Sequence, residues 1–186
     1  MTGAELLVPP PDGWNVDDLD AMPVSNYRYE LTDGALSVSP SPSNIHQTLA
    51  VYLFVELAKL APEPYKLGQA VEIRFARQLT RIPDLLVIRS DQPGRHWFAP
   101  SEVMVAIEIE SPGSHIEDRA TKPALYSGYG IPHYWRIELD ALKANVYDLG
   151  CGDGYRLRSE SDRITVQDPF PVDLELRELL PPWARD

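Results

Sequence analysis

The sequence predicts an α/β fold, in which a mixed β-sheet is flanked by helices and preceded by an N-terminal β-hairpin. Three observations support this prediction. Two β-prone runs flank an Asp-Gly turn near the start, two later stretches show helical spacing, and short strand-like runs follow each of them. The predicted order is hairpin, helix, three strands, helix and then further strands. The 186 residues, 44% of them hydrophobic, show no internal repeat or long linker and fit one domain with a sizeable core.

The chain is expected to begin with a flexible arm, residues 1–14, followed by a single domain, residues 15–186. Three consecutive prolines, Pro9 to Pro11, disfavour regular structure in the arm. A short helix is predicted at 16–22, where Pro23 should end it.

The hairpin is predicted from Tyr27–Leu31 and Ala35–Ser39, because the Asp-Gly pair between them suits a tight turn. A long helix should follow, with Ser43 or Asn44 as its N-cap, and should stop before Pro62. Its apolar residues recur at helical spacing and should pack on the sheet. They are Ile45, Leu49, Leu53, Leu57 and Leu60.

Three strands are predicted next. The first is a long strand at 65–76 with a bulge at Gly68, the second runs from 82 to 88 with Asp84 near its start, and the third covers 103–110. A polar and aromatic loop separates the second from the third.

The second helical stretch carries Asp118, Lys122 and Tyr126, whose spacing of four would set them on one face. Pro123 either kinks this helix or occupies its first turn, in which case the helix starts near Lys122. Gly130 suits the position just after the helix. Further strands are predicted before a short acidic tail, at 131–137, 144–149, 155–158 and 164–166.

The strand at 103–110 organises the candidate site. Alternation along it gives one face that ends in Glu108 and Glu110 and an opposite apolar row, formed by Val103, Val105, Ile107 and Ile109. Two carboxylates on one face repel each other, and a divalent cation between them is the usual solution, with Asp84 as a third ligand. The alternative is an edge strand whose charges prevent edge-to-edge pairing.

The formal net charge is −11, from 17 basic and 28 acidic residues, which argues against tight non-specific binding to a polyanion. The acidity is largely terminal. Between residues 74 and 96 the balance reverses, with arginines at Arg74, Arg77, Arg81, Arg89 and Arg95. The first three are candidates for phosphate contacts, and the alternative is a solvated face of a hairpin.

The sequence also predicts a location. Residues 1–13 contain no lysine or arginine, so no secretory signal with a basic start is expected, and no apolar run approaches the roughly 20 residues that span a bilayer. The single cysteine, Cys151, cannot form an intrachain disulfide. These features predict a cytoplasmic protein with no membrane partner.

Several short segments occur in an order that resembles the PD-(D/E)XK nuclease superfamily and, more closely, the Uma-type family of restriction endonucleases. The central pieces are Pro83-Asp84, then Glu108-Ile109-Glu110, then Lys122 on the following helix. The flanking pieces are at 29–34, 41–46 and 130–135. The resemblance extends from about residue 15 to residue 150 and implies a restriction-endonuclease-like fold.

The resemblance also implies roles for individual residues. Asp84 and Glu108, with the backbone carbonyl of Ile109, would hold Mg²⁺ or Mn²⁺ as the cofactor. The superfamily lysine usually stands two residues after the acid, where this chain has Glu110, so its role falls to Lys122. Glu110 would then be an additional ligand or a surface charge.

Two further residues are open to interpretation. Glu30 matches an acid near the metal in related folds, and the alternative is a strand residue that pairs with Arg28 or acts as a cap. His46, in the first turn of the long helix, is interpreted as a surface or capping residue.

The implied function is that of a metal-dependent endonuclease with DNA as its partner. A homodimer is expected, because a two-fold enzyme most simply cuts both strands of a two-fold target. Two alternatives are open. One is a catalytically inactive nuclease-fold protein with a binding or regulatory role, which the charge of −11 favours. The other is a metal-dependent hydrolase of another nucleic acid.

Overall fold

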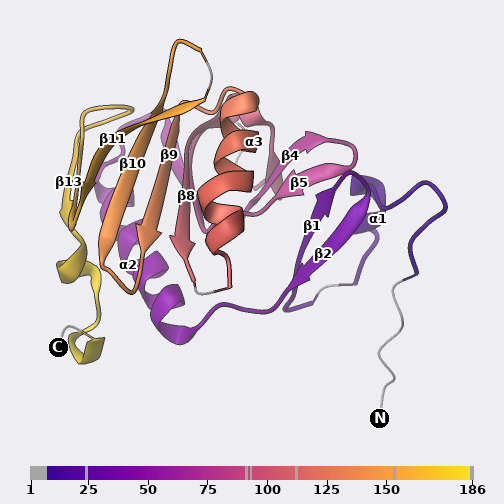
Figure 1. The fold of residues 1–186 in the computed structure, drawn as a ribbon, viewed down its shortest axis with the longest axis horizontal. Helices are drawn as coiled ribbons and strands as arrows, with labels where there is room; N and C mark the ends of the chain where they lie inside the picture. Colours follow the sequence, from indigo (N-terminus) through magenta and orange to yellow (C-terminus); the bar gives the residue numbers. More distant parts are fainter. Residues whose placement is uncertain are drawn as a thin grey trace.

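A six-stranded sheet forms the centre of the fold (Figure 1). The computed structural model describes residues 8–23, 25–90, 92, 94–111, 113–152 and 154–184. The strands of the sheet are β3 (Tyr65–Gln69), β6 (Leu85–Arg89), β8 (Val103–Glu110), β9 (His133–Glu138), β10 (Lys143–Leu149) and β11 (Tyr155–Ser161). Their order is β11-β10-β9-β8-β6-β3. The predicted mixed sheet is confirmed, since β8 and β9 run parallel and the other neighbouring pairs are antiparallel.

One face of the sheet is covered by α2 (Asn44–Leu60). Ser43 is its N-cap, as predicted, because its hydroxyl oxygen accepts a hydrogen bond from the amide of His46 (3.4 Å). Leu60, the last helical residue, is 41% exposed, so the end of the helix extends beyond the core and the prediction for this residue is wrong. The predicted apolar row is otherwise confirmed by three fully buried residues, Leu49, Leu53 and Leu57.

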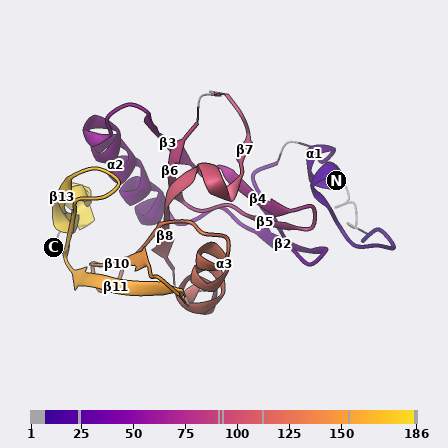
Figure 2. The same cartoon turned by 90° about the horizontal axis from the view of Figure 1, so that it is seen from above.

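The opposite face carries α3 (Lys122–Gly128), as Figure 2 shows. Tyr126 of this helix is fully buried against the sheet. Pro123 lies in the first turn, so the second of its two interpretations is confirmed. An unpredicted π-helical turn, η2 (Glu117–Thr121), leads directly into α3. Gly130 follows the helix with a positive φ of 79°, as predicted.

The predicted N-terminal hairpin is confirmed. β1 (Arg28–Thr32) pairs antiparallel with β2 (Ala35–Ser39). Asp33 and Gly34 between them have φ angles of 48° and 80°, the left-handed conformation that a two-residue hairpin turn of this type requires.

The chain before the hairpin contains α1 (Val16–Asp20), so the predicted short helix is confirmed and ends two residues early. Residues 1–7 of the predicted arm, like Pro112 of the acidic motif, lie outside the described residues. At the end of the arm, the amide of Trp14 donates a hydrogen bond to the carbonyl of Gly34 (2.8 Å), which places this end against the hairpin turn.

The prediction of one long strand at 65–76 is wrong. The chain turns at Ala70, which has a positive φ of 51° and whose amide donates to the carbonyl of Asp84 (3.0 Å). The second half of the segment therefore joins a separate sheet. That sheet contains β5 (Leu79–Arg81), β4 (Glu72–Ala76) and β7 (Trp97–Phe98), in this order.

β8 is a central strand, and the interpretation of a charged edge strand is wrong. β6 and β9 flank it, and Glu108 and Glu110 are only 2% and 4% exposed. Its two rows of side chains face the two helices. Val103 packs on the α3 side instead of joining the predicted apolar row, because the pairing with β6 slips by one residue at Met104.

The end of the chain adds β12 (Arg163–Val166), which pairs with β13 (Val172–Glu175). Short 3-10 helices in the described part of the chain are η1 (Pro100–Glu102), η3 (Leu176–Leu179) and η4 (Pro182–Ala184). The predicted acidic tail also carries regular structure and core residues that were not predicted. Its apolar residues alternate with the charged ones and enter the core on the α2 side, namely Phe170, Val172, Leu176 and Leu179. None of the helices in the described ranges is both long and apolar enough to cross a bilayer.

Candidate active site

A cavity of about 460 Å³ lies where the hairpin, the start of α2, β6, β8 and the η2–α3 segment meet. Because β6 and β8 are antiparallel, the start of one lies beside the end of the other. The titratable side chains and arginine that line the cavity are Arg28, Glu30, His46, Asp84, Glu108, Asp118 and Lys122. Four of the five residues predicted as catalytic therefore share one cavity, and the fifth, Glu110, does not line it.

Asp84 directly precedes β6, and its carboxylate is held by three groups. Oδ1 accepts a hydrogen bond from Arg28 Nη1 (2.8 Å), while Oδ2 accepts from the amide of Ile109 (2.9 Å) and lies 3.1 Å from His46 Nε2. Burial alone would raise the pKa of Asp84, but His46 and Arg28 outweigh it and lower the pKa to about 2. Asp84 is thus a fixed anion at neutral pH.

Glu108 faces the cavity from the α3 side of β8. Its Oε2 accepts a hydrogen bond from Lys122 Nζ (2.8 Å), and its Oε1 accepts one from the Tyr126 hydroxyl (2.7 Å). Burial raises the pKa of Glu108. Lys122 opposes this rise, whereas the nearby charges of Asp118 and Asp84 add to it. The Glu108 carboxyl is therefore harder to ionise in this position than in water.

Lys122 joins two carboxylates. Its Nζ lies 2.8 Å from Glu108 Oε2 and 2.9 Å from Asp118 Oδ1, and its side chain is 12% exposed. Burial by itself lowers the pKa of a lysine, but Glu108, Asp118 and Glu30 more than reverse this and raise the pKa of Lys122. The side chain is thus a fixed cation beside Glu108.

The π-helical turn η2 sets the direction of these side chains. In η2 the amide of Lys122 donates to the carbonyl of Glu117, five residues earlier. The next donor in this pattern would be Pro123, which has no N–H. The carbonyl of Asp118 accepts instead from the Tyr134 hydroxyl (2.6 Å). The wide turn, supported from β9, thus directs Asp118 and Lys122 toward β8.

Glu30 supports the segment that leads to Asp84. Its Oε1 accepts a hydrogen bond from the amide of Ile82 (2.6 Å). The predicted partner Arg28 binds Asp84 instead. A catalytic role for Glu30 remains a prediction.

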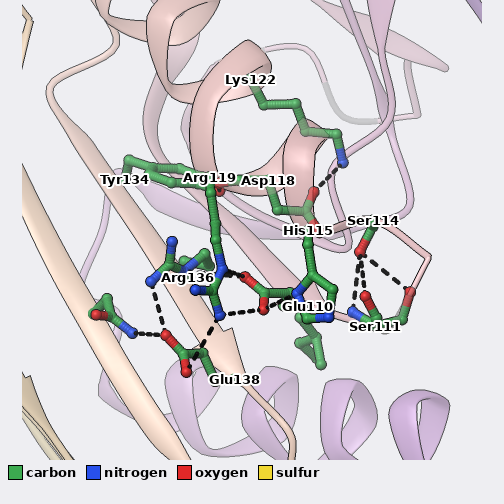
Figure 3. Close-up of polar contacts among 12 residues, drawn as sticks. Glu110, Ser111, Ser114, His115, Asp118, Arg119, Lys122, Tyr134, Arg136 and Glu138 are labelled. Carbon is green, nitrogen blue, oxygen red and sulfur yellow. Dashed lines mark hydrogen bonds and ion pairs between the residues drawn. The ribbon is translucent and has the colours of Figure 1, made fainter.

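Glu110 lies outside the cavity, within a group of basic side chains (Figure 3). Arg119 binds it with two nitrogens, Nε at 2.8 Å and Nη2 at 2.7 Å, and the ring of His115 hydrogen-bonds to it. Burial by itself raises the pKa of Glu110, but Arg119 and His115 reverse this and lower it. A ligand role for Glu110 remains a prediction that no contact with the cavity supports.

Two residues of the site were not predicted. His46 is only 5% exposed, and its Nε2 is 2.9 Å from the Ile109 carbonyl oxygen, so its interpretation as a surface or capping residue is wrong. A signal was present, since His46 stands three residues before Leu49 on the buried face of α2. Arg28 gave no such signal, because its contact with Asp84 spans 56 residues of sequence.

The oxygen atoms of the site fit a hard divalent cation. Asp84, Glu108 and the Ile109 carbonyl offer the ligand types that Mg²⁺ prefers, with water completing its shell. Burial is the main cause that raises the pKa of Glu108, and the charges of Asp118 and Asp84 add to it, so a cation bound here would favour the ionised carboxylate. Within the described ranges, no group of three or more His, Cys, Asp or Glu side chains is arranged to hold a metal ion. An ion at this site would use two carboxylates and a carbonyl.

The arginines predicted to contact phosphate are engaged elsewhere. Arg74 and Arg77 form ion pairs with Asp20 and Asp17 of α1. Arg81 is 4% exposed and donates to backbone carbonyls, so the alternative of a solvated arginine face is wrong for this residue.

Comparisons with known proteins give a family and a fold. The sequence model of a family described as "Uma2: Putative restriction endonuclease" matches residues 16–179. A crystal structure of "a putative nuclease belonging to DUF820" from Anabaena variabilis ATCC 29413 is similar, with a TM-score of 0.70 and 17% identity. The match covers 89% of this chain and 97% of the other, and it confirms the predicted nuclease-type α/β fold. No curated protein sequence matches the chain significantly.

Proposed function

The chain belongs to the Uma2 family, and from this premise we propose that it is a metal-dependent endonuclease that hydrolyses phosphodiester bonds of DNA. The observation that carries the proposal is the meeting of Asp84, Glu108 and Lys122 in one cavity. Oxygen ligands beside a fixed cation are what phosphodiester hydrolysis requires, because negative charge builds on the phosphate in the transition state.

Asp84, Glu108 and the carbonyl of Ile109 would hold Mg²⁺ or Mn²⁺. The bound ion would neutralise charge on the scissile phosphate and lower the pKa of a water molecule. The protein prepares this site by fixing each carboxylate. Arg28 and the Ile109 amide orient Asp84, and the Tyr126 hydroxyl orients Glu108.

Lys122 supplies the fixed positive charge. Its raised pKa keeps the ammonium protonated throughout the range in which proteins work. At 12% exposure the charge is little screened by water, so it would act strongly on a phosphate that enters the cavity. Its roles would be to orient the attacking water and to stabilise the pentacovalent phosphorus.

We further propose that DNA is the substrate and that the protein acts as a homodimer. The family description and the description of the similar structure both refer to nucleases. A two-fold dimer would present one cavity to each strand of a two-fold target.

A second candidate function is a catalytically inactive binding or regulatory protein. The observation in its favour is that the acids of the cavity already have partners, since Arg28 and His46 hold Asp84 while Lys122 and Tyr126 hold Glu108. The net charge of −11 favours it as well. A hydrolase of another nucleic acid would share the site and differ only in substrate.

Calorimetric titration with Mn²⁺ and cleavage of plasmid DNA and of RNA, each in Mg²⁺ and Mn²⁺, test these functions together. Asp84→Asn should lose both Mn²⁺ binding and cleavage. Asp173→Asn is the matched control, since Asp173 is an exposed aspartate paired with Arg163 on β12, and it should lose neither. Cleavage of RNA alone would replace DNA as the substrate. Wild-type protein that neither binds Mn²⁺ nor cleaves either nucleic acid would overturn the nuclease proposal in favour of the second candidate.

A further inference from the structure

Each of the two carboxylates on β8 is paired with its own basic side chains. Glu108 and Glu110 lie two residues apart on the same face of the strand, yet they share no cation. Glu108 pairs with Lys122, while Glu110 pairs with Arg119, His115 and, at 3.4 Å, Arg136 Nε. All of these partners except Arg136 belong to the segment 115–122, so this segment is attached to β8 at two neighbouring points.

We propose that Glu110 is a positioning residue: by holding Arg119 it fixes the η2 turn so that Asp118 and Lys122 face Glu108. The inference rests on the proposed function, because the group it positions is the proposed catalytic lysine. It replaces the expectation that Glu110 is a metal ligand or a surface charge.

The contact between Glu110 and Arg119 is built to fix an orientation. Arg119 binds both carboxylate oxygens through two nitrogens, an arrangement that determines direction as well as distance. The Glu110 side chain is 2% exposed, whereas that of Arg119 is 47% exposed. The central strand β8 is therefore the fixed side of the pair, and η2 is the side that is held.

The η2 turn needs support from outside. π-helical turns are rare, and this one cannot continue its own hydrogen-bond pattern because Pro123 lacks an N–H. Two consecutive residues of η2 are held from the sheet instead. The Asp118 carbonyl is held by Tyr134 of β9, and the Arg119 side chain is held by Glu110 of β8. Figure 3 shows the contact between Arg119 and Glu110.

Loss of this support should move Lys122 relative to Glu108. Lys122 directly follows η2 and reaches two carboxylates at 2.8 and 2.9 Å. A displacement of about 1 Å in such a group costs on the order of 10²-fold in rate when the group acts in the transition state. The cation-binding oxygens of Asp84 and Glu108 lie on the sheet side and should stay in place.

The test uses Glu110→Gln, Arg119→Met and the double variant, with Lys143→Met as the control. Lys143 forms an exposed ion pair with Glu160 at 2.8 Å on β10 and β11, away from the cavity. Three quantities are measured on the full chain: kcat and KM for DNA cleavage, the Mn²⁺ dissociation constant by calorimetry, and amide hydrogen exchange by peptide.

The expected result for each single variant is a fall in kcat of about tenfold to a hundredfold. KM and the Mn²⁺ dissociation constant should stay within about twofold of wild type, and exchange should accelerate in residues 115–122 but not in α2. The double variant should have about the same kcat as the less active single variant, since each single variant already removes the contact between Glu110 and Arg119. Arg119→Lys should recover only part of kcat, because lysine cannot bind both oxygens in a fixed geometry.

Three outcomes would overturn the inference. A large loss of Mn²⁺ affinity in Glu110→Gln would make Glu110 a ligand. Wild-type kcat in both single variants, or faster exchange throughout the chain, would leave it a purely structural residue. Should Glu110→Gln fail to fold, Arg119→Met tests the same contact from its half-exposed side.

Failure of the proposed function has a different signature. Wild-type protein that cleaves nothing would remove the nuclease proposal. The hydrogen-exchange comparison would still decide whether Glu110 and Arg119 hold the η2 turn, because unchanged exchange in residues 115–122 of both variants would refute it.

Discussion

Substitution of Lys122 by methionine is the most direct perturbation of the site. Methionine keeps most of the apolar stem and removes the ammonium, which lies 2.8 Å from Glu108 and 2.9 Å from Asp118. Removing one partner of a buried ion pair leaves an uncompensated charge and costs about 3–5 kcal/mol. For a chain of this size that corresponds to a fall in melting temperature of about 6–20 °C. Cleavage should be abolished.

The effect of Lys122→Met should depend on metal and on pH. Mn²⁺ should bind as tightly as in wild type or slightly more tightly, because a repelling cation has been removed, and should recover part of the lost stability. The pKa of Glu108 is already raised by burial, and it should rise further without Lys122. A carboxyl with a raised pKa in the folded state gains a proton on folding. This stabilisation is present below the unfolded value, about 4.3, and is lost as the pH rises through the folded value.

The assay measures this pH dependence of stability. Thermal unfolding of wild type, Lys122→Met and the Lys143→Met control is measured in EDTA and in Mn²⁺, at pH 5.5 and pH 8. The Lys122 variant should lie closer to wild type at pH 5.5 than at pH 8. The Lys143→Met control should melt close to wild type at either pH, because an exposed ion pair is screened by water. A Lys122→Met protein that melts like wild type in EDTA at pH 8, or cuts DNA at the wild-type rate, would refute the assignment of Lys122.

Three other expectations concern the site and the core. Asp84→Asn should weaken Mn²⁺ binding by at least tenfold in a calorimetric titration, because it removes the charge of one proposed ligand, and unchanged affinity would contradict that role. Tyr134→Phe should lower the free energy of unfolding in urea by about 1–3 kcal/mol, since the buried Asp118 carbonyl loses its hydrogen-bond donor. A free energy of unfolding equal to that of wild type within the measurement error would contradict the account of η2. Leu53→Ala should cost about 2–5 kcal/mol in the same assay, because Leu53 is fully buried, whereas Leu60→Ala should cost less than about 1 kcal/mol; equal losses would contradict the packing of α2.

Most secondary structure of this protein could be predicted from the sequence, because each signal lies within a few neighbouring residues. The Asp33-Gly34 pair identified the hairpin, since both residues tolerate the left-handed backbone of its turn. The leucines of α2 identified its buried face, because helical spacing brings them to one side. Pro123 indicated a helix start near Lys122.

The sequence also identified most of the charged residues that line the cavity. Alternation along β8 placed Glu108 and Glu110 on one face, and the resemblance to a nuclease family pointed to Lys122 on the next helix. These inferences required only local periodicity and the order of the motifs. Neither source could show that β8 is a central strand, because the neighbours of a strand are chosen by the packing of the whole sheet.

Only the tertiary structure decided which charged groups meet. Arg28 reaches Asp84 across 56 residues and His46 reaches Ile109 across 63, separations over which no sequence periodicity carries information. Glu108 and Glu110 are equivalent in the sequence pattern, yet one faces the cavity and the other binds Arg119, because different parts of the η2–α3 segment pack over each. The sequence by itself determined which residues can share a face of the sheet. The elements folded against that face determined their partners, because a side chain's electrostatic environment is set by groups that packing brings from elsewhere in the chain.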